Sequence, residues 1–207
     1  MSILSHRVVP ALLSVSLCAL VIAMWACTPQ RPVLPSQPVP APLNGAALEP
    51  PVNLPDLSFV RTDGGTFTTA DTAGRTSLFY FGYTHCPDMC PLTLAELSHL
   101  RRSLCTSANQ VDMYFVTLDL PRDTPGRMRE YVANFPGVVG LIGSDAQLAE
   151  AQAAFNVVAT RRDMGNGEYL LDHAAAIYLV NRSNQIQLAY PYGTDPSEIA
   201  SDLSQLA

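Results

Sequence analysis

The feature that most constrains the fold is a continuous apolar run, Leu78–Tyr83, which leads into a segment with leucines at helical spacing. An unbroken apolar run is typical of a strand buried on both faces, because a strand with one face in water alternates apolar and polar residues. The leucines that follow are Leu94, Leu97, Leu100 and Leu104. A strand buried on both faces needs a covering layer above and below its sheet. The sequence therefore predicts an α/β fold.

Strands and helices continue to alternate along the rest of the chain. Further strands are expected at Val111–Leu118 and Val138–Ile142, followed by a hairpin at Ala176–Val180 and Ile186–Tyr190. Helices are expected after Thr124-Pro125, around Leu148–Phe155 and after Asp195. This order predicts a central mixed β-sheet flanked by helices on both faces.

Prolines divide the chain into parts. Nine of the seventeen prolines lie between Thr28 and Pro55. Because proline fixes φ and has no N–H, we expect residues 28–55 to be an extended spacer. The globular domain is then expected at residues 56–207, which is a common size for a single domain. We expect this domain to be a monomer.

Residues 1–27 have the pattern of an export signal. Arg7 ends a short polar region, and sixteen of the nineteen residues from Val8 to Ala26 are apolar. Ala26-Cys27 resembles the end of a bacterial lipobox, which makes Cys27 the expected lipidation site. Nineteen helical residues extend about 28 Å, so an uncleaved membrane anchor is an alternative, and free secretion is another. All three place the domain outside the cytoplasm, and we expect a membrane-anchored protein facing the periplasm.

The charged residues exclude several classes of function. The chain contains no lysine, so it has neither a P-loop lysine nor a Schiff-base lysine. Twelve basic residues against eighteen acidic ones give a net charge of −6. Binding to nucleic-acid phosphates depends on an excess of basic residues, so we expect no nucleic-acid partner. Five cysteines are too few for a disulfide scaffold.

Two cysteines follow the buried strand. Cys86 and Cys90 are four residues apart at the start of the expected helix, which puts them on the same side of it. Amide groups and the helix dipole favour negative charge there, so both thiols are expected to ionise more readily than a free cysteine. Such thiolates serve as redox groups or as metal ligands, and their spacing allows a disulfide to form and break. A pair of buried apolar cysteines or a static disulfide is the structural alternative.

A histidine stands where a thioredoxin-type enzyme has a proline. Such enzymes have two residues between their cysteines, whereas three separate Cys86 from Cys90. The position facing the dithiol falls in Leu171–Ala175, which contains His173. Two thiolates and one imidazole suit three-coordinate Cu(I) and also hold Cu(II). We expect Arg161–Asp172 to be a loop that lets His173 approach or leave the dithiol.

Three segments in order resemble the signatures of the Sco/SenC family. They are Phe81–Pro91, Asp119 with Arg122–Pro125, and Asp172–Val180. The similarity covers about residues 56–207. It implies a thioredoxin-like fold, tethered to a membrane, that binds one copper ion through Cys86, Cys90 and His173. It also implies that the protein delivers copper to the binuclear copper site in subunit II of cytochrome c oxidase, or reduces the cysteines of that site.

Five further residues lie in or near these segments. Pro121 stands one position later than in the family pattern, and its loop is expected near the site without supplying a ligand. Cys105 is expected to be a buried apolar thiol, and His99 a surface or helix-packing residue. His85 is a candidate for tuning the ligands or assisting copper transfer, with a plain turn residue as the alternative. Asp88 is a candidate fourth Cu(II) ligand or a charge at the helix mouth.

Three functions fit these residues. The first is a metallochaperone for Cu(I) and Cu(II), whose partner is subunit II of cytochrome c oxidase or another copper or thiol protein. The second is an extracytoplasmic thiol:disulfide oxidoreductase in which Cys86 and Cys90 are the catalytic dithiol. The third is peroxide reduction, suggested by Thr84 on the same turn as Cys86. We prefer the first.

Overall fold

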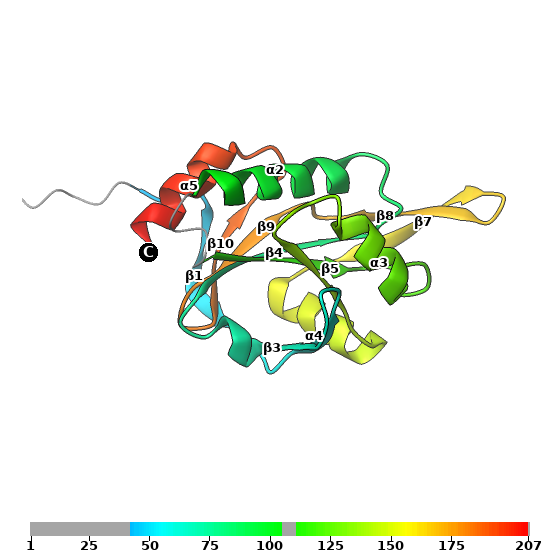
Figure 1. Cartoon of the computed structure of the whole chain (residues 1–207), viewed down its shortest axis with the longest axis horizontal. Coiled ribbons are helices and arrows are strands. Elements are labelled where there is room, and N and C mark those ends of the chain that lie inside the picture. The colour runs from blue at the N-terminus through cyan, green and yellow to red at the C-terminus, as the bar shows by residue number, and fades with distance from the viewer. Residues whose placement is uncertain (1–41, 105–110, 207) are drawn as a thin grey trace, which may run out of the picture. The chain divides into compact units, whose positions relative to one another are not determined.

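The protein is described by a computed structural model of residues 42–104 and 111–206 (Figure 1). Its centre is an eight-stranded sheet in the order β1-β10-β9-β4-β5-β6-β2-β3, and β7 and β8 form a separate two-stranded sheet. β4, β5 and β6 are parallel, and the remaining neighbours are antiparallel. The predicted mixed sheet is therefore confirmed.

The elements follow one another in a largely alternating order. The strands are β1 (Ala46–Asn53), β2 (Ser58–Arg61), β3 (Thr66–Thr68), β4 (Thr76–Gly82), β5 (Val111–Thr117), β6 (Val138–Ile142), β7 (Ala159–Gly165), β8 (Glu168–His173), β9 (Ile177–Val180) and β10 (Gln185–Tyr190). The helices are the short 3₁₀ helix η1 (Thr69–Thr72), α2 (Met89–Ser103), α3 (Pro125–Val132), α4 (Asp145–Phe155) and α5 (Pro196–Gln205). Thr124 and Asp195 cap α3 and α5 with their side chains.

β4 lies between two apolar clusters, and all seven of its residues are buried. Leu78 and Tyr80 belong to the cluster formed with α2, α3 and α5. Phe79 and Phe81 belong to the cluster formed with α4, on the other face of the sheet (Figure 1). Successive side chains of a strand point to opposite faces, so a strand that packs on both sides buries both sets of side chains. The predicted helical cover on both faces is confirmed.

The sheet begins earlier in the chain than predicted. The sequence predicts a spacer as far as Pro55, but β1 pairs antiparallel with β10 at the edge of the sheet. An edge strand tolerates proline, because one of its sides needs no N–H donors. Pro50 and Pro51 lie between the two paired parts of β1, at Ala46–Ala47 and Val52–Asn53. The predicted boundary at residue 56 is therefore wrong, and the compact domain includes residues from 42 onward.

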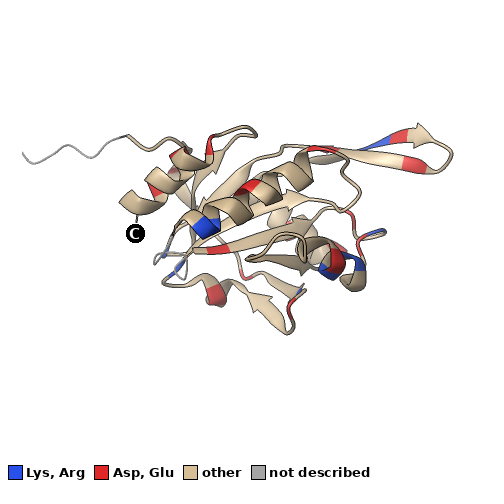
Figure 2. Ribbon diagram, turned by 45° about the horizontal axis from the view of Figure 1, so that its top comes forward, with Lys and Arg blue, Asp and Glu red and all other residues tan. Residues whose placement is uncertain are grey.

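The segment predicted as a loop before His173 is a β-hairpin. β7 and β8 pair antiparallel around Asn166 and Gly167, whose φ angles are 55° and 83°. Two positive φ angles define the type I′ turn that Asn-Gly favours. The hairpin extends away from the main sheet (Figure 1) and carries charges of both signs (Figure 2). Because nearly all of β7 is exposed, no apolar alternation marks it as a strand.

Several predictions concern residues outside those described. The export signal, Cys27, the first part of the proline-rich segment and Cys105 all lie in residues 1–41 or 105–110. Among residues 42–104 and 111–206, no helix combines the length and the apolar character needed to cross a membrane.

A buried carboxylate joins the start of the domain to its last helix. Asp202 of α5 is 0% exposed. It accepts hydrogen bonds from the backbone N–H groups of Asn44 and Gly45, each at 2.9 Å, and from the Asn44 side chain at 2.8 Å. The Tyr190 hydroxyl donates to it at 3.1 Å. Three of these four donors lie before β1, so the chain upstream of residue 56 satisfies a charge in the interior.

We expect a fragment that starts at Asp56 to be less stable than one that starts at Pro42. The shorter fragment lacks β1 and leaves the Asp202 carboxylate with one of these four donors, at a cost of more than about 2 kcal/mol in the free energy of unfolding. Urea denaturation of both fragments measures the difference. Asp202→Asn serves as the control, because it should destabilise the longer fragment and have little effect on the shorter one. Equal stability of the two unsubstituted fragments would contradict this account.

Candidate metal centre

The two cysteines lie where β4 passes into α2. Cys86 is in the turn after β4 and Cys90 is in the first turn of α2. Both are free thiols, with Cys86 9% exposed and Cys90 0% exposed. A side chain at Gly82 would not fit, because its Cβ would lie 2.7 Å from Cys90 Sγ. The thiols therefore occupy the carboxyl end of the central strand, where α/β sheets usually have their sites.

His173 ends strand β8 next to these cysteines. Its Nε2 lies 3.9 Å from Cys90 Sγ, and its Nδ1 lies 3.1 Å from the carbonyl oxygen of Ala174. With the ring proton on Nδ1 and donated to that carbonyl oxygen, Nε2 is unprotonated. Its lone pair then faces Cys90 Sγ. The structure thus brings the three predicted ligand residues together from two elements that are 83 residues apart in the sequence.

The arrangement fits a soft metal ion. For a first-row ion such as zinc, bonds of about 2.3 Å to sulfur and about 2.0 Å to nitrogen put two ligand atoms about 3.5–4.3 Å apart. The distance between Cys90 Sγ and His173 Nε2 lies in this range. The Cys90 backbone N–H donates to Cys86 Sγ at 3.4 Å, which holds the second sulfur beside the helix end. Thiolate and imidazole ligands together are suited to copper.

Two tyrosines surround the dithiol and the imidazole. The Tyr80 hydroxyl donates to Cys90 Sγ at 3.6 Å from a fully buried position on β4. The rings of Tyr80 and Tyr83 pack edge-on against His173, with centroid distances of 6.5 Å and 6.1 Å. The Tyr83 hydroxyl accepts a hydrogen bond from the Leu171 N–H at 3.2 Å. The sequence does not reveal these roles, because tyrosines in an apolar run resemble ordinary core residues.

The two thiols differ in ionisation. A hydrogen bond from Cys90, with further help from the Asp88 and Cys90 backbone, lowers the pKa of Cys86 to about 5 in spite of burial. The pKa of Cys90 is raised, because Cys90 donates to Cys86 and because its sulfur is buried. The prediction that both thiols ionise readily is right for Cys86 and wrong for Cys90. A second negative charge beside the first, in a buried position, is unfavourable.

The loop after β5 stabilises the cysteine turn, which is the turn between β4 and α2 that contains Cys86. Asp123 is 1% exposed and accepts hydrogen bonds from the Thr84 hydroxyl at 2.6 Å, the Thr84 N–H at 3.0 Å and the Thr117 hydroxyl at 2.6 Å. Asp119 accepts from Arg122 Nε at 2.5 Å and from the Tyr169 hydroxyl at 2.6 Å. The loop therefore lies beside the site, as predicted. Because the Thr84 hydroxyl donates its hydrogen bond to Asp123, a structural role for this threonine is favoured over a role in peroxide reduction.

His85, Asp119 and Asp123 form a second group of possible metal-binding atoms, which lie within 4.8 Å of one another. His85 Nδ1 is 3.7 Å from Asp123 Oδ1 and 3.2 Å from Thr84 Oγ1. Both carboxylates already accept the hydrogen bonds just described, so the group is a polar network that supports the turn. His85 itself is exposed.

The remaining predicted residues are placed as follows. Asp88 is exposed and precedes α2, and it makes no side-chain cap hydrogen bond. His99 is exposed on α2, which confirms it as a surface residue. A contribution of Asp88 to Cu(II) binding stays a prediction.

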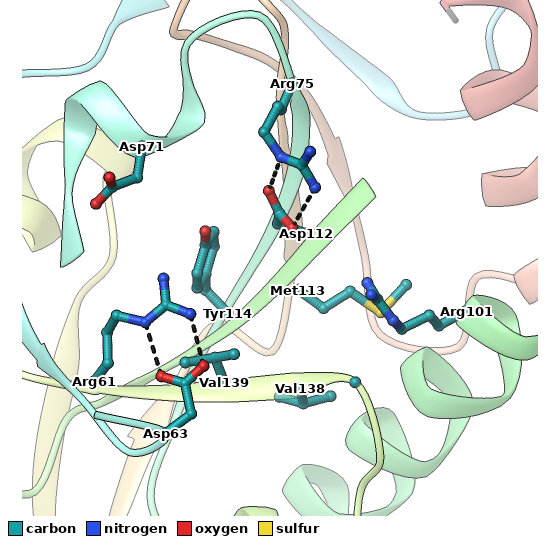
Figure 3. A pocket seen from close by; sticks show the side chains of 11 residues that line it. Arg61, Asp63, Asp71, Arg75, Arg101, Asp112, Met113, Tyr114, Val138 and Val139 are labelled. Carbon is teal, nitrogen blue, oxygen red and sulfur yellow. Dashed lines mark hydrogen bonds and ion pairs between the residues drawn. The ribbon is translucent and has the colours of Figure 1, made fainter. Parts of the chain in front are cut away.

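A cavity of about 270 Å³ opens beside the dithiol. It is lined by Tyr83, Cys86, Pro87, Asp88, Met89, Arg162, Leu170, Leu171, Asp172 and His173. A larger cavity of about 610 Å³ lies at the amino ends of β5 and β6, away from the cysteines. Figure 3 shows that two of its arginines are paired with carboxylates, Arg61 with Asp63 and Arg75 with Asp112. The smaller cavity is therefore the one that gives access to the candidate ligands.

Relatives of known sequence agree with the motifs. The model of the SCO1/SenC family matches residues 47–207. The SCO2-like protein of Rickettsia felis is 31% identical over 147 residues, which cover 70% of this chain and 72% of that protein.

Solved structures agree with the fold. The structure of Bradyrhizobium japonicum ScoI with copper bound has a TM-score of 0.70 and 33% identity, and the match covers 75% of this chain and 99% of that one. BsSco, described as a member of the Sco family of cytochrome c oxidase assembly proteins, has a TM-score of 0.63 and 21% identity, over 82% of this chain and 98% of that one. The predicted thioredoxin-like fold is confirmed. With its family match, its relatives and its fold in agreement, the chain belongs to the SCO1/SenC family.

Proposed function

We propose that this protein is a copper chaperone that binds one copper ion through Cys86, Cys90 and His173. The observation that carries the proposal is the distance of 3.9 Å between Cys90 Sγ and His173 Nε2, with Cys86 Sγ held at the same helix end. The family relative ScoI of Bradyrhizobium japonicum was solved with copper bound. Two soft sulfur ligands and one imidazole suit Cu(I) and can also hold Cu(II).

Each ligand has its own part in capturing the metal, which is the cargo of the protein. Cys86 is a thiolate at neutral pH and lines the cavity, so it is the first sulfur that an incoming ion meets. Cys90 is fully buried and gives up its proton when the metal binds. His173 completes the set from β8. A three-ligand site leaves room for a sulfur or nitrogen of the recipient to join the ion before the donor ligands leave.

The anchor and the recipient complete the proposal. Residues 1–27 hold the protein at the membrane, through a lipid on Cys27 or as an uncleaved helix, and the proline-rich segment before β1 is the spacer. The domain then faces the periplasm as a monomer. The proposed recipient is the binuclear copper site in subunit II of cytochrome c oxidase. In support, BsSco is described as belonging to a family of cytochrome c oxidase assembly proteins.

A second function, thiol:disulfide exchange with a partner, is favoured by the unequal thiols. Cys86 combines a lowered pKa with access to the cavity, which are properties of an attacking cysteine. Cys90 lies one helical turn away and could complete a disulfide with it. In this function Cys86 and Cys90 reduce the cysteines of the partner, and His173 is dispensable.

We expect His173→Ala to weaken Cu(II) binding by at least about tenfold, because the imidazole is one of three ligands. The absorption from thiolate-to-copper charge transfer should be lost or shifted. Cu(I) affinity should fall less, since two sulfurs remain. Copper titrations with optical and paramagnetic spectra measure these effects. His99→Ala is the matched control, because it removes an exposed histidine of α2. If His173→Ala bound both copper states like the parent, the third ligand would be wrongly assigned.

We expect Cu(I) affinity to rise about tenfold per pH unit between pH 7 and 8, which corresponds to one proton released per ion. The lowered pKa of Cys86, about 5, means that its thiolate is already present in this range and is lost only as the pH falls through 5. The raised pKa of Cys90 means that its thiol keeps its proton until copper displaces it. Competition with a chelator of known affinity measures the slope. Cys90→Ser should flatten it, and a slope near zero in the parent would refute the assigned ionisation.

We expect the reduced protein to reduce insulin disulfides slowly at most, because Cys86, the attacking thiol, is only 9% exposed. Turbidity of precipitating insulin chains measures the rate. Cys86→Ser and Cys90→Ser define the background. Rapid reduction that depends on both cysteines and is unchanged in His173→Ala would favour the oxidoreductase function over the chaperone.

A further inference from the structure

Within residues 42–104 and 111–206, the hairpin that carries His173 has no strand pairing with the main sheet. β7 and β8 pair with each other alone. The position of His173 relative to Cys90 therefore depends on contacts of other kinds between β8 and the rest of the domain. The most buried residue of the hairpin strands is Tyr169, which is 9% exposed, whereas the other residues of β7 and β8 are exposed or half-buried.

Tyr169 is held from three sides. Its hydroxyl donates to Asp119 Oδ1 at 2.6 Å, and its carbonyl oxygen accepts from Arg122 Nη1 at 3.0 Å. The Arg122 guanidinium also lies over the Tyr169 ring, 3.5 Å from its centroid. Arg161 covers the ring as well, at 3.9 Å. Because Asp119 and Arg122 are themselves ion-paired, the three groups form a closed ring of contacts between β8 and the loop after β5.

These contacts extend to the part of β8 that carries His173. Arg122 lies 5.7 Å from the centroid of Tyr83, whose hydroxyl accepts from the Leu171 N–H. Alternate residues of a strand point to the same face, so Tyr169, Leu171 and His173 share one face of β8. A shift of Tyr169 out of its place would therefore move His173 away from the cysteines.

We propose that Tyr169, with Arg122 and Asp119, is a clamp that positions His173 over the dithiol. This inference rests on the proposed function in that it takes His173 to be a copper ligand. Tyr169 and Arg122 are positioning residues, because they act through β8 and neither is assigned a bond to the metal. The clamp anchors the start of β8, at Tyr169, four residues before His173 at the end of the strand.

The test uses the full reduced chain in detergent, with Tyr169→Phe and Arg122→Lys as variants. Tyr169→Phe keeps the ring and removes the hydrogen bond to Asp119, and Arg122→Lys keeps the charge and removes the planar group. Tyr178→Phe is the matched control, because Tyr178 is a buried tyrosine of β9 in the cluster on the α4 side of the sheet.

Amide hydrogen exchange without metal is the first measurement. Loss of a hydrogen bond to a charged group should speed exchange in β7 and β8 by about tenfold in both clamp variants, with β4 and α2 unchanged. Cu(II) spectra are the second measurement. Both variants should shift toward the spectrum of His173→Ala and bind Cu(II) at least about tenfold more weakly, whereas Tyr178→Phe should match the parent.

The two measurements distinguish failure of the clamp from failure of the proposed copper-binding function. Parent-like exchange in β7 and β8 together with parent-like Cu(II) spectra in both variants would overturn the clamp. If the parent bound no copper, the proposed function would fail, and the exchange measurement would still decide whether Tyr169 holds the hairpin. Global loosening in Tyr169→Phe, with β4 and α2 also exchanging faster, would count against a local clamp unless Arg122→Lys showed the local pattern.

Discussion

Burial of β4 on both faces is the constraint on which the candidate site depends. Two apolar clusters hold the strand from opposite sides, so its carboxyl end leaves the sheet at a defined place. Gly82 then allows α2 to begin close enough that Cys90 Sγ lies against the strand. The thiols are thus positioned by the packing of the domain. A preformed pair of sulfurs reduces the ordering that ligand capture would otherwise require.

The sequence predicted the elements with strong periodicity and the residues with distinctive chemistry. β4, β5, β6 and the main helices follow from apolar runs, helical spacing and caps, and the cysteines and His173 from their motifs. β1 is not predicted, because its prolines resemble those of a spacer. The β7–β8 hairpin is not predicted either, because its residues are exposed and its Asn166-Gly167 turn is equally typical of a loop. The role of Tyr169 could not be predicted, because it depends on Asp119, fifty residues away in the sequence.

The polar groups around the site divide into two sets with different tasks. Asp123 ties the cysteine turn to the end of β5, whereas Asp119 ties the hairpin to the same loop. One short loop therefore contacts both segments that carry the candidate ligands, the turn leading into α2 and strand β8. The difference in pKa between Cys86 and Cys90 has a separate origin, which is the hydrogen bond between the two sulfurs. Both proposed functions use that difference, since each begins with a single thiolate, Cys86, that lines the cavity.

The bonds from Asn44 and Gly45 to Asp202 give the domain a defined path for mechanical load. A pull on the chain from its amino-terminal side reaches these bonds before it reaches β1, and they pass the force to α5. α5 packs in the same apolar cluster as α2, on which Cys90 lies. β1 is an edge strand at the far end of the sheet order from β2 and β3, with β10 and β9 between it and β4. Tension at this end is therefore borne first by hydrogen bonds to a buried carboxylate and by one outer strand, before it reaches β4.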